Sequence, residues 1–320
     1  MSWWFLAVAT VCVAMAPEDS DLDKARSAYW DGDYATALAG LEPLAVNGNS
    51  TAPRYLAYRF LRGVGVKKDP TKAVALFRCA ADRGDLLSVF SLGGLYAEGL
   101  GVEKNEQEAV KLYTRAAKAG LANAQLNLGS MYRFGVGVPQ NLHEAVRWFR
   151  AAAEQGHARA QAILGYCYSE GLGVDSNATE AVLWLRRASE KDYPEAEYML
   201  ALKYLKGVGV SKDLIEGFKL FKRAAEWGEV RAQYDLGVLY ATGQGSQRDA
   251  VQAHLWFSLA ASQGYRDSAA AVAHLERAMY TDQITEAHRL REQWKPRKRV
   301  RPKGMLDWEW LALSEGQTAP

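Results

Sequence analysis

Histidine, cysteine and catalytic motifs are scarce in this chain of 320 residues, which has five histidines and three cysteines. No G-x-S-x-G nucleophile motif occurs. His143 and Glu144 begin like a zinc-protease motif, but Arg147 stands where the second histidine would be. No histidine pair has convincing metal-ligand spacing. We therefore expect a non-enzyme with no catalytic residue, no cofactor and no metal site.

A hydrophobic run long enough to cross a membrane is also missing. The longest candidate, residues 1–16 (MSWWFLAVATVCVAMA), is shorter than the ~20 residues that a transmembrane helix needs. It ends in Ala14-Met15-Ala16, an A-x-A cleavage pattern, which predicts a secretory signal peptide and a periplasmic or secreted protein. No Lys or Arg precedes the run, and Pro17 follows it. The alternatives are an uncleaved inner-membrane anchor and a buried cap helix.

Charge of one sign does not dominate, because the net charge is only +2. The segment 295–304 (KPRKRVRPKG) carries six positive charges, so the rest of the chain has −4. We expect this basic part of the 295–320 tail to be a solvated extension; a membrane surface could bind it through Lys295–Lys303, whereas nucleic acid is not an expected partner. Trp308 and Trp310 are expected to fold back onto the rest of the chain.

What the chain has in abundance is a repeat with a period of 36 residues, marked by glycine pairs. The six pairs are Gly63/Gly65, Gly99/Gly101, Gly135/Gly137, Gly171/Gly173, Gly207/Gly209 and Gly243/Gly245. A fixed period of this size indicates a solenoid of supersecondary units. We call the helix expected before each pair the A helix and the one after it the B helix.

Each B helix has a predicted start and end. Asp or Asn stands at the N-cap, at Asp69, Asn105, Asn141, Asn177, Asp213 and Asp249. Glu or Gln follows three residues later in five units, as in a capping box. A glycine ends the helix in five units, and Asp192 replaces it in the other, so we expect a looser junction there. Gly217 replaces a helix alanine and is expected to weaken that helix by ~1 kcal/mol.

Large and small residues alternate within the repeat. An apolar pair such as Trp148/Phe149 is expected to fill the space between helices, and Gly129 on the A helix to allow close approach. Cys79 and Cys167 lie more than two repeats apart, so we expect no disulfide between them, since repeats contact only their neighbours.

The run A-x-x-x-L-G-x-x-Y-x-x-G-x-G-V, followed by A-x-x-W-[FY]-x-x-A-A-x-x-G, resembles the Sel1-like repeat, a relative of the tetratricopeptide repeat. The resemblance covers residues 52–265 with six units. It implies an all-α, right-handed solenoid whose concave face is lined mainly by A helices. Residues 22–48 resemble a tetratricopeptide-like capping hairpin, with its first helix over 24–30, and 266–294 are expected to form C-terminal capping helices.

Candidate binding residues are A-helix positions that differ from repeat to repeat. They are Tyr55, Tyr58, Asn127, Tyr166, Met199, Leu202 and Asp235. A further variable position holds Phe134, Glu170 and Lys206. Such variation is expected of a surface shaped for one partner, and equally of unconstrained surface or local packing. Aromatic residues and Met are favoured as interface anchors.

The resemblance implies an adaptor that binds a partner protein, and we expect a monomer. The role could be that of an envelope regulator, or of an immunity protein that neutralises a secreted toxic effector such as a lipase. The alternatives are a protein that binds or modifies peptidoglycan and a membrane-tethered scaffold.

Overall fold

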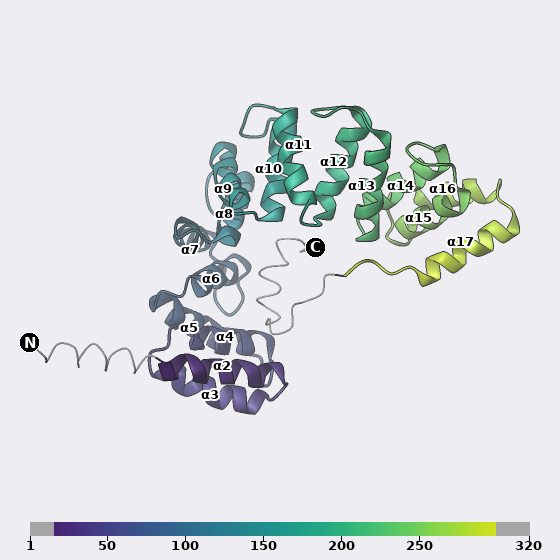
Figure 1. The fold of residues 1–320 in the computed structure, drawn as a ribbon. Helices are drawn as coiled ribbons and strands as arrows, with labels where there is room; N and C mark the ends of the chain where they lie inside the picture. The colour runs from purple at the N-terminus through teal and green to yellow at the C-terminus, as the bar shows by residue number, and fades with distance from the viewer. Residues whose placement is uncertain (1–15, 299–320) are drawn as a thin grey trace, which may run out of the picture. The chain divides into compact units, whose positions relative to one another are not determined.

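The computed structural model describes residues 16–298, which form sixteen helices and no strand (Figure 1). The A helices are α4 (Ala52–Arg62), α6 (Leu86–Glu98), α8 (Ala122–Phe134), α10 (Ala158–Glu170), α12 (Pro194–Lys206) and α14 (Val230–Thr242). The B helices are α5 (Pro70–Asp82), α7 (Glu106–Lys118), α9 (Leu142–Glu154), α11 (Ala178–Ser189), α13 (Leu214–Glu226) and α15 (Ala250–Ser262). Flanking them are α2 (Ala16–Trp30), α3 (Tyr34–Val46), α16 (Ser268–Glu276) and α17 (Thr281–Gln293). The described residues divide into two compact units, 16–141 and 142–298.

The helical repeat and the all-α solenoid are confirmed. Each A helix ends at the first glycine of its pair, which adopts a left-handed conformation; Gly171, for example, has φ of 70°. Five of the predicted Asp or Asn caps accept hydrogen bonds from the first turn of their B helix. Asn105 accepts from the Glu108 backbone N–H at 2.9 Å.

The second half of the predicted capping box is replaced by another bond. A capping box needs the backbone N–H of the cap residue as a donor to the Glu side chain. In the structure this N–H donates to a carbonyl of the preceding A helix, as from Asn105 to Tyr96 at 2.8 Å and from Asp213 to Tyr204 at 3.0 Å. Glu108 instead forms an ion pair with Lys111 at 3.1 Å.

The second glycine of each pair has a different task from the first. A Cβ placed on Gly173 would lie 2.2 Å from the Leu142 carbonyl oxygen, and one on Gly209 would lie 2.2 Å from that of Ala178. Those carbonyls belong to the first residue of the B helix in the preceding repeat. In five of the six units the second glycine therefore places the turn directly against the backbone of the preceding B helix, whereas a Cβ on Gly65 would meet the Tyr34 side chain.

The glycines equivalent to Gly129 in other A helices allow close packing, as was predicted for Gly129 itself. A Cβ on Gly93 would lie 2.7 Å from the Tyr113 ring, and one on Gly237 would lie 2.8 Å from the Phe257 ring. Gly217 serves a similar purpose, because its Cβ would lie 2.1 Å from Leu205. Gly217 thus lowers the helix propensity of α13, but it also leaves the space in which Leu205, from the A helix of the same repeat, packs.

The junction at Asp192 has the same backbone as its glycine counterparts, and it is held by Arg223. Asp192 adopts φ of 53° despite its side chain. The Arg223 guanidinium lies 3.1 Å from the Asp192 carboxylate and 2.5 Å from that of Glu197, and it donates to the Ser189 carbonyl at 3.0 Å. Glu197 is fully buried, and burial raises its pKa to about 7 against the attraction of Arg223. The prediction of a looser junction did not include Arg223, whose hydrogen bond and ion pairs hold this junction together.

The ends of the chain differ from expectation. α2 begins at Ala16 and not at Lys24. Most of the predicted signal peptide (1–15) and the tail with Trp308 and Trp310 (299–320) lie outside the described residues. The start of the basic tail is not simply solvated, since Arg297 donates its backbone N–H to the Glu226 carbonyl at 2.8 Å and pairs with its carboxylate at 2.8 Å. Every helix within 16–298 is too short or too polar to cross a membrane.

His157 is the half-buried N-cap of α10. Its Nδ1 accepts a hydrogen bond from the Ala160 backbone N–H at 3.3 Å. Burial lowers the pKa of His157 to about 4, and the positive charges of Arg159 and Lys191 lower it further. The imidazole is therefore neutral in the folded protein at neutral pH.

The two glycines of one pair give a matched test of their different tasks. A Cβ on Gly171 would meet its neighbours at ordinary distances, 3.5 Å from the Ser176 Cβ and 3.7 Å from the Val174 carbonyl oxygen. Gly171→Ala should therefore cost only the left-handed backbone strain of ~1 kcal/mol. Gly173→Ala adds a clash with a backbone carbonyl and should cost ~3 kcal/mol or more. Urea unfolding of both variants measures this, and equal losses would contradict the seating role of the second glycine.

Stability should depend on pH through His157. The unfolded imidazole titrates near ~6.5. Between that pH and about 4, where the folded imidazole titrates, the unfolded chain binds more protons. The contribution is therefore complete above pH ~6.5 and declines as the pH falls towards 4. His157→Asn keeps a capping acceptor without titrating, so its melting temperature relative to wild type should rise between pH 7.5 and pH 5. The same difference at both pH values would refute this.

Candidate functional site

A groove of about 440 Å³ lies on the C-terminal unit and is lined mainly by A helices. Its lining residues are Tyr166, Ser169 and Glu170 of α10, Leu185 of α11, Tyr198, Met199, Leu202, Lys203 and Lys206 of α12, Val208, and Arg231 of α14. Three of the seven predicted binding residues, Tyr166, Met199 and Leu202, are among them. The structure thus brings together residues that are 33 to 36 positions apart in the sequence.

Apolar side chains form the body of the groove. Met199 and Leu202 are half-buried and pack on the core of the C-terminal unit. Tyr166 and Val208 are 37% and 40% exposed, so part of each side chain faces solvent at the groove. Tyr166 lies on the A helix α10 beside the buried stripe, where side chains point away from the B helices. Val208 lies in the turn between Gly207 and Gly209.

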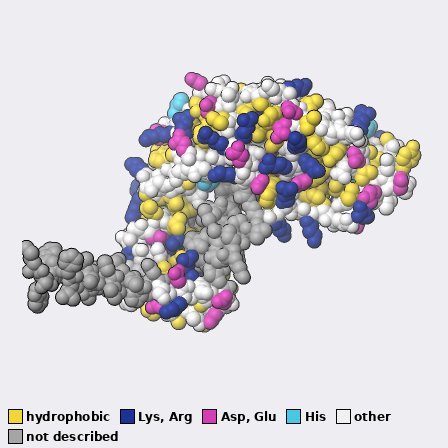
Figure 2. All heavy atoms as spheres, viewed as in Figure 1, with side chains coloured by type: hydrophobic (Ala, Val, Ile, Leu, Met, Phe, Trp, Pro, Cys, Tyr) yellow, Lys and Arg dark blue, Asp and Glu magenta, His cyan; other side chains and the backbone are white. Residues whose placement is uncertain are grey.

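Basic side chains surround this apolar surface. Lys203 Nζ donates to Ser169 Oγ at 2.5 Å and so connects α12 to α10. The Arg231 guanidinium lies 4.5 Å from the centroid of the Tyr198 ring, and its Nε is 2.6 Å from Glu229. The lining includes three basic residues and one acidic residue, Glu170. Figure 2 shows basic and hydrophobic side chains interspersed over the helices of this unit.

Asp235 and Asn127 hold tyrosine hydroxyls and do not line the groove. Asp235 accepts a hydrogen bond from Tyr198, and burial raises the pKa of its carboxyl group. Asn127 is bonded to the hydroxyl of Tyr113, whose pKa burial raises to about 12. Asp235 therefore does not line the groove itself but positions the groove residue Tyr198. Asn127 belongs to the N-terminal unit and is not part of the groove lining.

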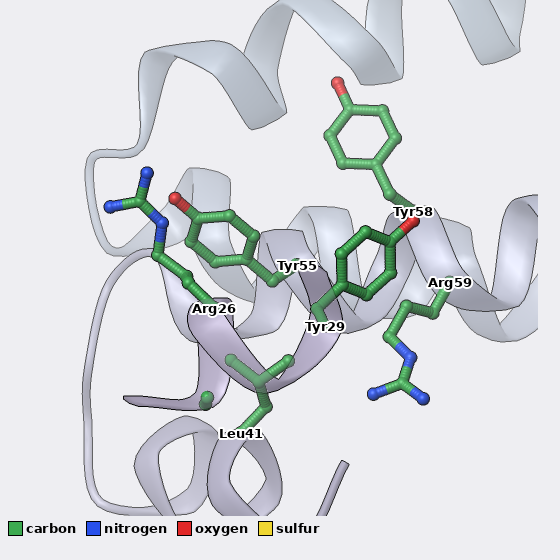
Figure 3. A pocket seen from close by; sticks show the side chains of 7 residues that line it. Arg26, Tyr29, Leu41, Tyr55, Tyr58 and Arg59 are labelled. Carbon is green, nitrogen blue, oxygen red and sulfur yellow. The ribbon is translucent and has the colours of Figure 1, made fainter. Parts of the chain in front are cut away.

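Tyr55 is a packing residue of the N-terminal unit. Its side chain is only 8% exposed, and the guanidinium carbons of Arg26 and Arg54 lie 5.7 and 5.1 Å from its ring centroid. Figure 3 shows it beside Tyr29 and Tyr58 around a pocket of about 20 Å³, which has room for about one water molecule. This pocket is too small for a partner side chain.

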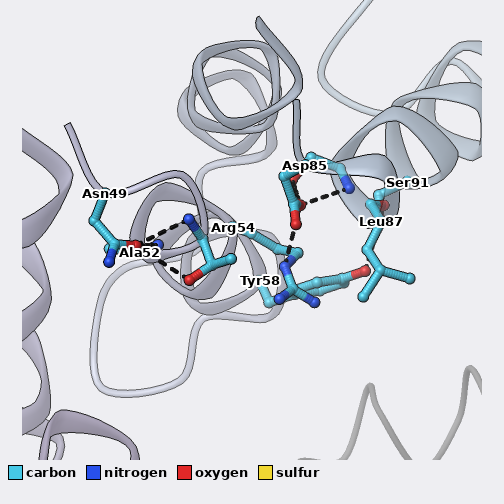
Figure 4. Close-up of polar contacts among 9 residues, drawn as sticks. Asn49, Ala52, Arg54, Tyr58, Asp85, Leu87 and Ser91 are labelled. Carbon is cyan, nitrogen blue, oxygen red and sulfur yellow. Dashed lines mark hydrogen bonds and ion pairs between the residues drawn. The ribbon is translucent and has the colours of Figure 1, made fainter. Parts of the chain in front are cut away.

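Tyr58 fastens α4 to the next repeat. Its hydroxyl lies 2.5 Å from Ser91 Oγ, and its ring meets Phe77 edge-on at 4.9 Å. Close by, Arg54 is paired at 3.2 Å with Asp85, the buried N-cap of α6 (Figure 4). The side chains at both of these variable positions are thus engaged in packing contacts of α4.

Sequence analysis did not select the other eight lining residues as binding candidates; they are Ser169, Glu170, Leu185, Tyr198, Lys203, Lys206, Val208 and Arg231. Lys206 and Glu170 share a position that was recognised as variable, which is a usable signal. Tyr198 occupies a position that reads as core, and its role becomes visible only through Asp235 and Arg231. The lining contains no histidine or cysteine and a single carboxylate. Its chemistry suits recognition of apolar and acidic groups.

Comparison with protein families identifies six Sel1 repeats, at residues 53–85, 87–121, 122–157, 158–193, 194–228 and 230–265. A comparison with curated proteins finds no match. Among solved structures, a Sel1 repeat protein from Oxalobacter formigenes is 31% identical with a TM-score of 0.68, covering 75% of this chain and 96% of its own.

Two further structures show weaker similarity. A protective antigen of uropathogenic Escherichia coli with an SLR fold is 25% identical, with a TM-score of 0.39, and the match covers 87% of this chain and 76% of its own. An immunity protein from Pseudomonas aeruginosa is 21% identical, with a TM-score of 0.41 and coverage of 65% and 81%.

Proposed function

The chain belongs to the Sel1 repeat family, and we propose that it is a non-catalytic scaffold that binds one partner protein in the groove of its C-terminal unit. The observation that carries the proposal is the convergence of exposed Tyr166 and Val208 with Met199 and Leu202 at one place. Interfaces are anchored by aromatic residues and Met in a desolvated centre with a polar rim.

The charge of the groove defines the partner further. Lys203, Lys206 and Arg231 face a single lining carboxylate, and Glu229 compensates only Arg231. A segment that carries apolar side chains flanked by Asp or Glu is complementary to this arrangement, which would also steer its association. The occupant we propose is such a segment of another protein.

Cross-linking from defined positions tests the proposal in the native host. A photo-reactive residue at Met199 in the groove should capture one dominant protein, and the same residue at Ile215 on α13 should not. Ile215 is 60% exposed but lies outside the groove lining, so it controls for exposure alone. Equal capture at both positions, or none at Met199, would contradict the proposal.

The affinity for the captured protein should depend on groove chemistry. Tyr166→Ala with Lys206→Glu removes one exposed ring and reverses one charge, and binding should weaken at least tenfold, about 1.4 kcal/mol or more. Ile215→Ala with Lys222→Glu makes the same kinds of change on α13, where both side chains are exposed. This control variant should bind like wild type in calorimetry.

The identity of the captured protein distinguishes the roles within this proposal. A secreted toxin would make the chain an immunity protein, and an envelope or signalling protein would make it an adaptor or regulator. Retention on purified sacculi without a protein partner would favour the peptidoglycan alternative instead.

We also propose export to the periplasm, on the pattern of residues 1–16. The intact mass of protein isolated from the native host should then begin at Pro17. A mass that includes Met1, with the protein in the membrane fraction, would support the tethered scaffold and exclude a cleaved signal peptide.

A further inference from the structure

Three potential metal ligands converge in the C-terminal helices, outside the groove. They are His254 of α15, Glu276 of α16 and His288 of α17, and one donor atom from each lies within 4.8 Å of the other two. Glu276 Oε1 is 2.9 Å from His254 Nε2 and 4.0 Å from His288 Nε2. Sequence spacing did not reveal the cluster, because it forms where the 36-residue period ends.

His254 occupies a position that the repeat fills with apolar residues. Its equivalents at intervals of 36 residues are Val74, Val110, Val146, Val182 and Phe218. His254 itself is only 1% exposed. The packing of the repeat therefore does not require an imidazole here, and burial of a polar ring needs a compensating interaction.

We propose that His254, Glu276 and His288 bind a divalent transition-metal ion, with Zn²⁺ as the best match. Two imidazole nitrogens and one carboxylate oxygen are a ligand set that Zn²⁺ accepts at ~2.0–2.2 Å. Donor atoms at that distance from a tetrahedral ion are ~3.4 Å apart. The separations of Glu276 Oε1 from the two imidazoles, 2.9 and 4.0 Å, lie on either side of this value, and all three donor atoms lie within 4.8 Å of one another. Binding of the ion would require side-chain rotations that bring the three donors to this spacing.

The surroundings of the cluster support this assignment. The second nitrogen of His254, Nδ1, is 3.3 Å from Ser258 Oγ, the kind of contact that orients a ligating imidazole. His288 is 55% exposed, which gives an ion a path from solvent and leaves room for a water ligand. The bound ion would fasten α16 and α17 to α15, where the glycine-turn contacts of the repeats no longer act.

Zinc binding to the tag-free, chelator-treated full chain tests the proposal. Calorimetric titration with Zn²⁺ should give one site with micromolar or tighter affinity, and Zn²⁺ should raise the melting temperature above that in EDTA. Co²⁺ should produce the visible absorption of a site with nitrogen and oxygen ligands and low coordination number. His288→Ala and Glu276→Gln should weaken binding at least tenfold and abolish the thermal shift.

His274→Ala is the matched control, because His274 is an exposed histidine on the same helix as Glu276 and is not part of the cluster. It should bind Zn²⁺ within twofold of wild type. Only weak, multi-site binding by the wild type would overturn the proposal, as would unchanged affinity in His288→Ala. The wild-type titration decides this even if a variant fails to fold.

Discussion

The contact between the second turn glycine and the preceding B helix is the constraint on which the rest of this chain depends. At Gly173 and Gly209 the turn approaches a backbone carbonyl so closely that any side chain would collide with it. That contact sets the spacing between successive repeats. Buried side chains can change in size only within that spacing, and this is why alanine and glycine recur wherever helices cross.

The same regularity explains how much of the fold the sequence could predict. Helix ends follow from local chemistry, a left-handed glycine at one end and an Asp or Asn acceptor at the other, so they could be placed from the chain alone. The acceptor for the backbone N–H of the cap residue could not be predicted in this way. Both the Glu side chain and the Tyr96 carbonyl can accept this hydrogen bond, and only the geometry of the folded turn selects the carbonyl. Arg223 compensates for Asp192 from 31 positions away, beyond the reach of local rules.

Of the predicted binding residues, Tyr166, Met199 and Leu202 line the groove, whereas Tyr55 and Tyr58 pack within the N-terminal unit. That the groove residues bind a partner stays a prediction. Tyr166 and Tyr58 hold the same repeat position, yet one ring is exposed at the groove and the other is bonded to Ser91 beneath its neighbours. The difference lies in what the adjacent repeats place against each ring. His254 shows the opposite case, a residue that looked isolated in sequence and acquires two partners from the terminal helices. Sequence variation among repeats identifies positions that depart from the repeat consensus. The structural role of the residue at such a position depends on the side chains that adjacent helices pack against it.

The backbone bond from each cap residue to the A-helix carbonyl nine positions earlier closes the intervening turn into a loop of fixed length. The first glycine fixes where this loop leaves the A helix, and the second fixes where it rests on the preceding repeat. A single inserted or deleted residue would break all of these contacts together. Within the glycine turn, evolutionary change is therefore limited to the exchange of side chains at constant length, and insertions have to fall outside this segment.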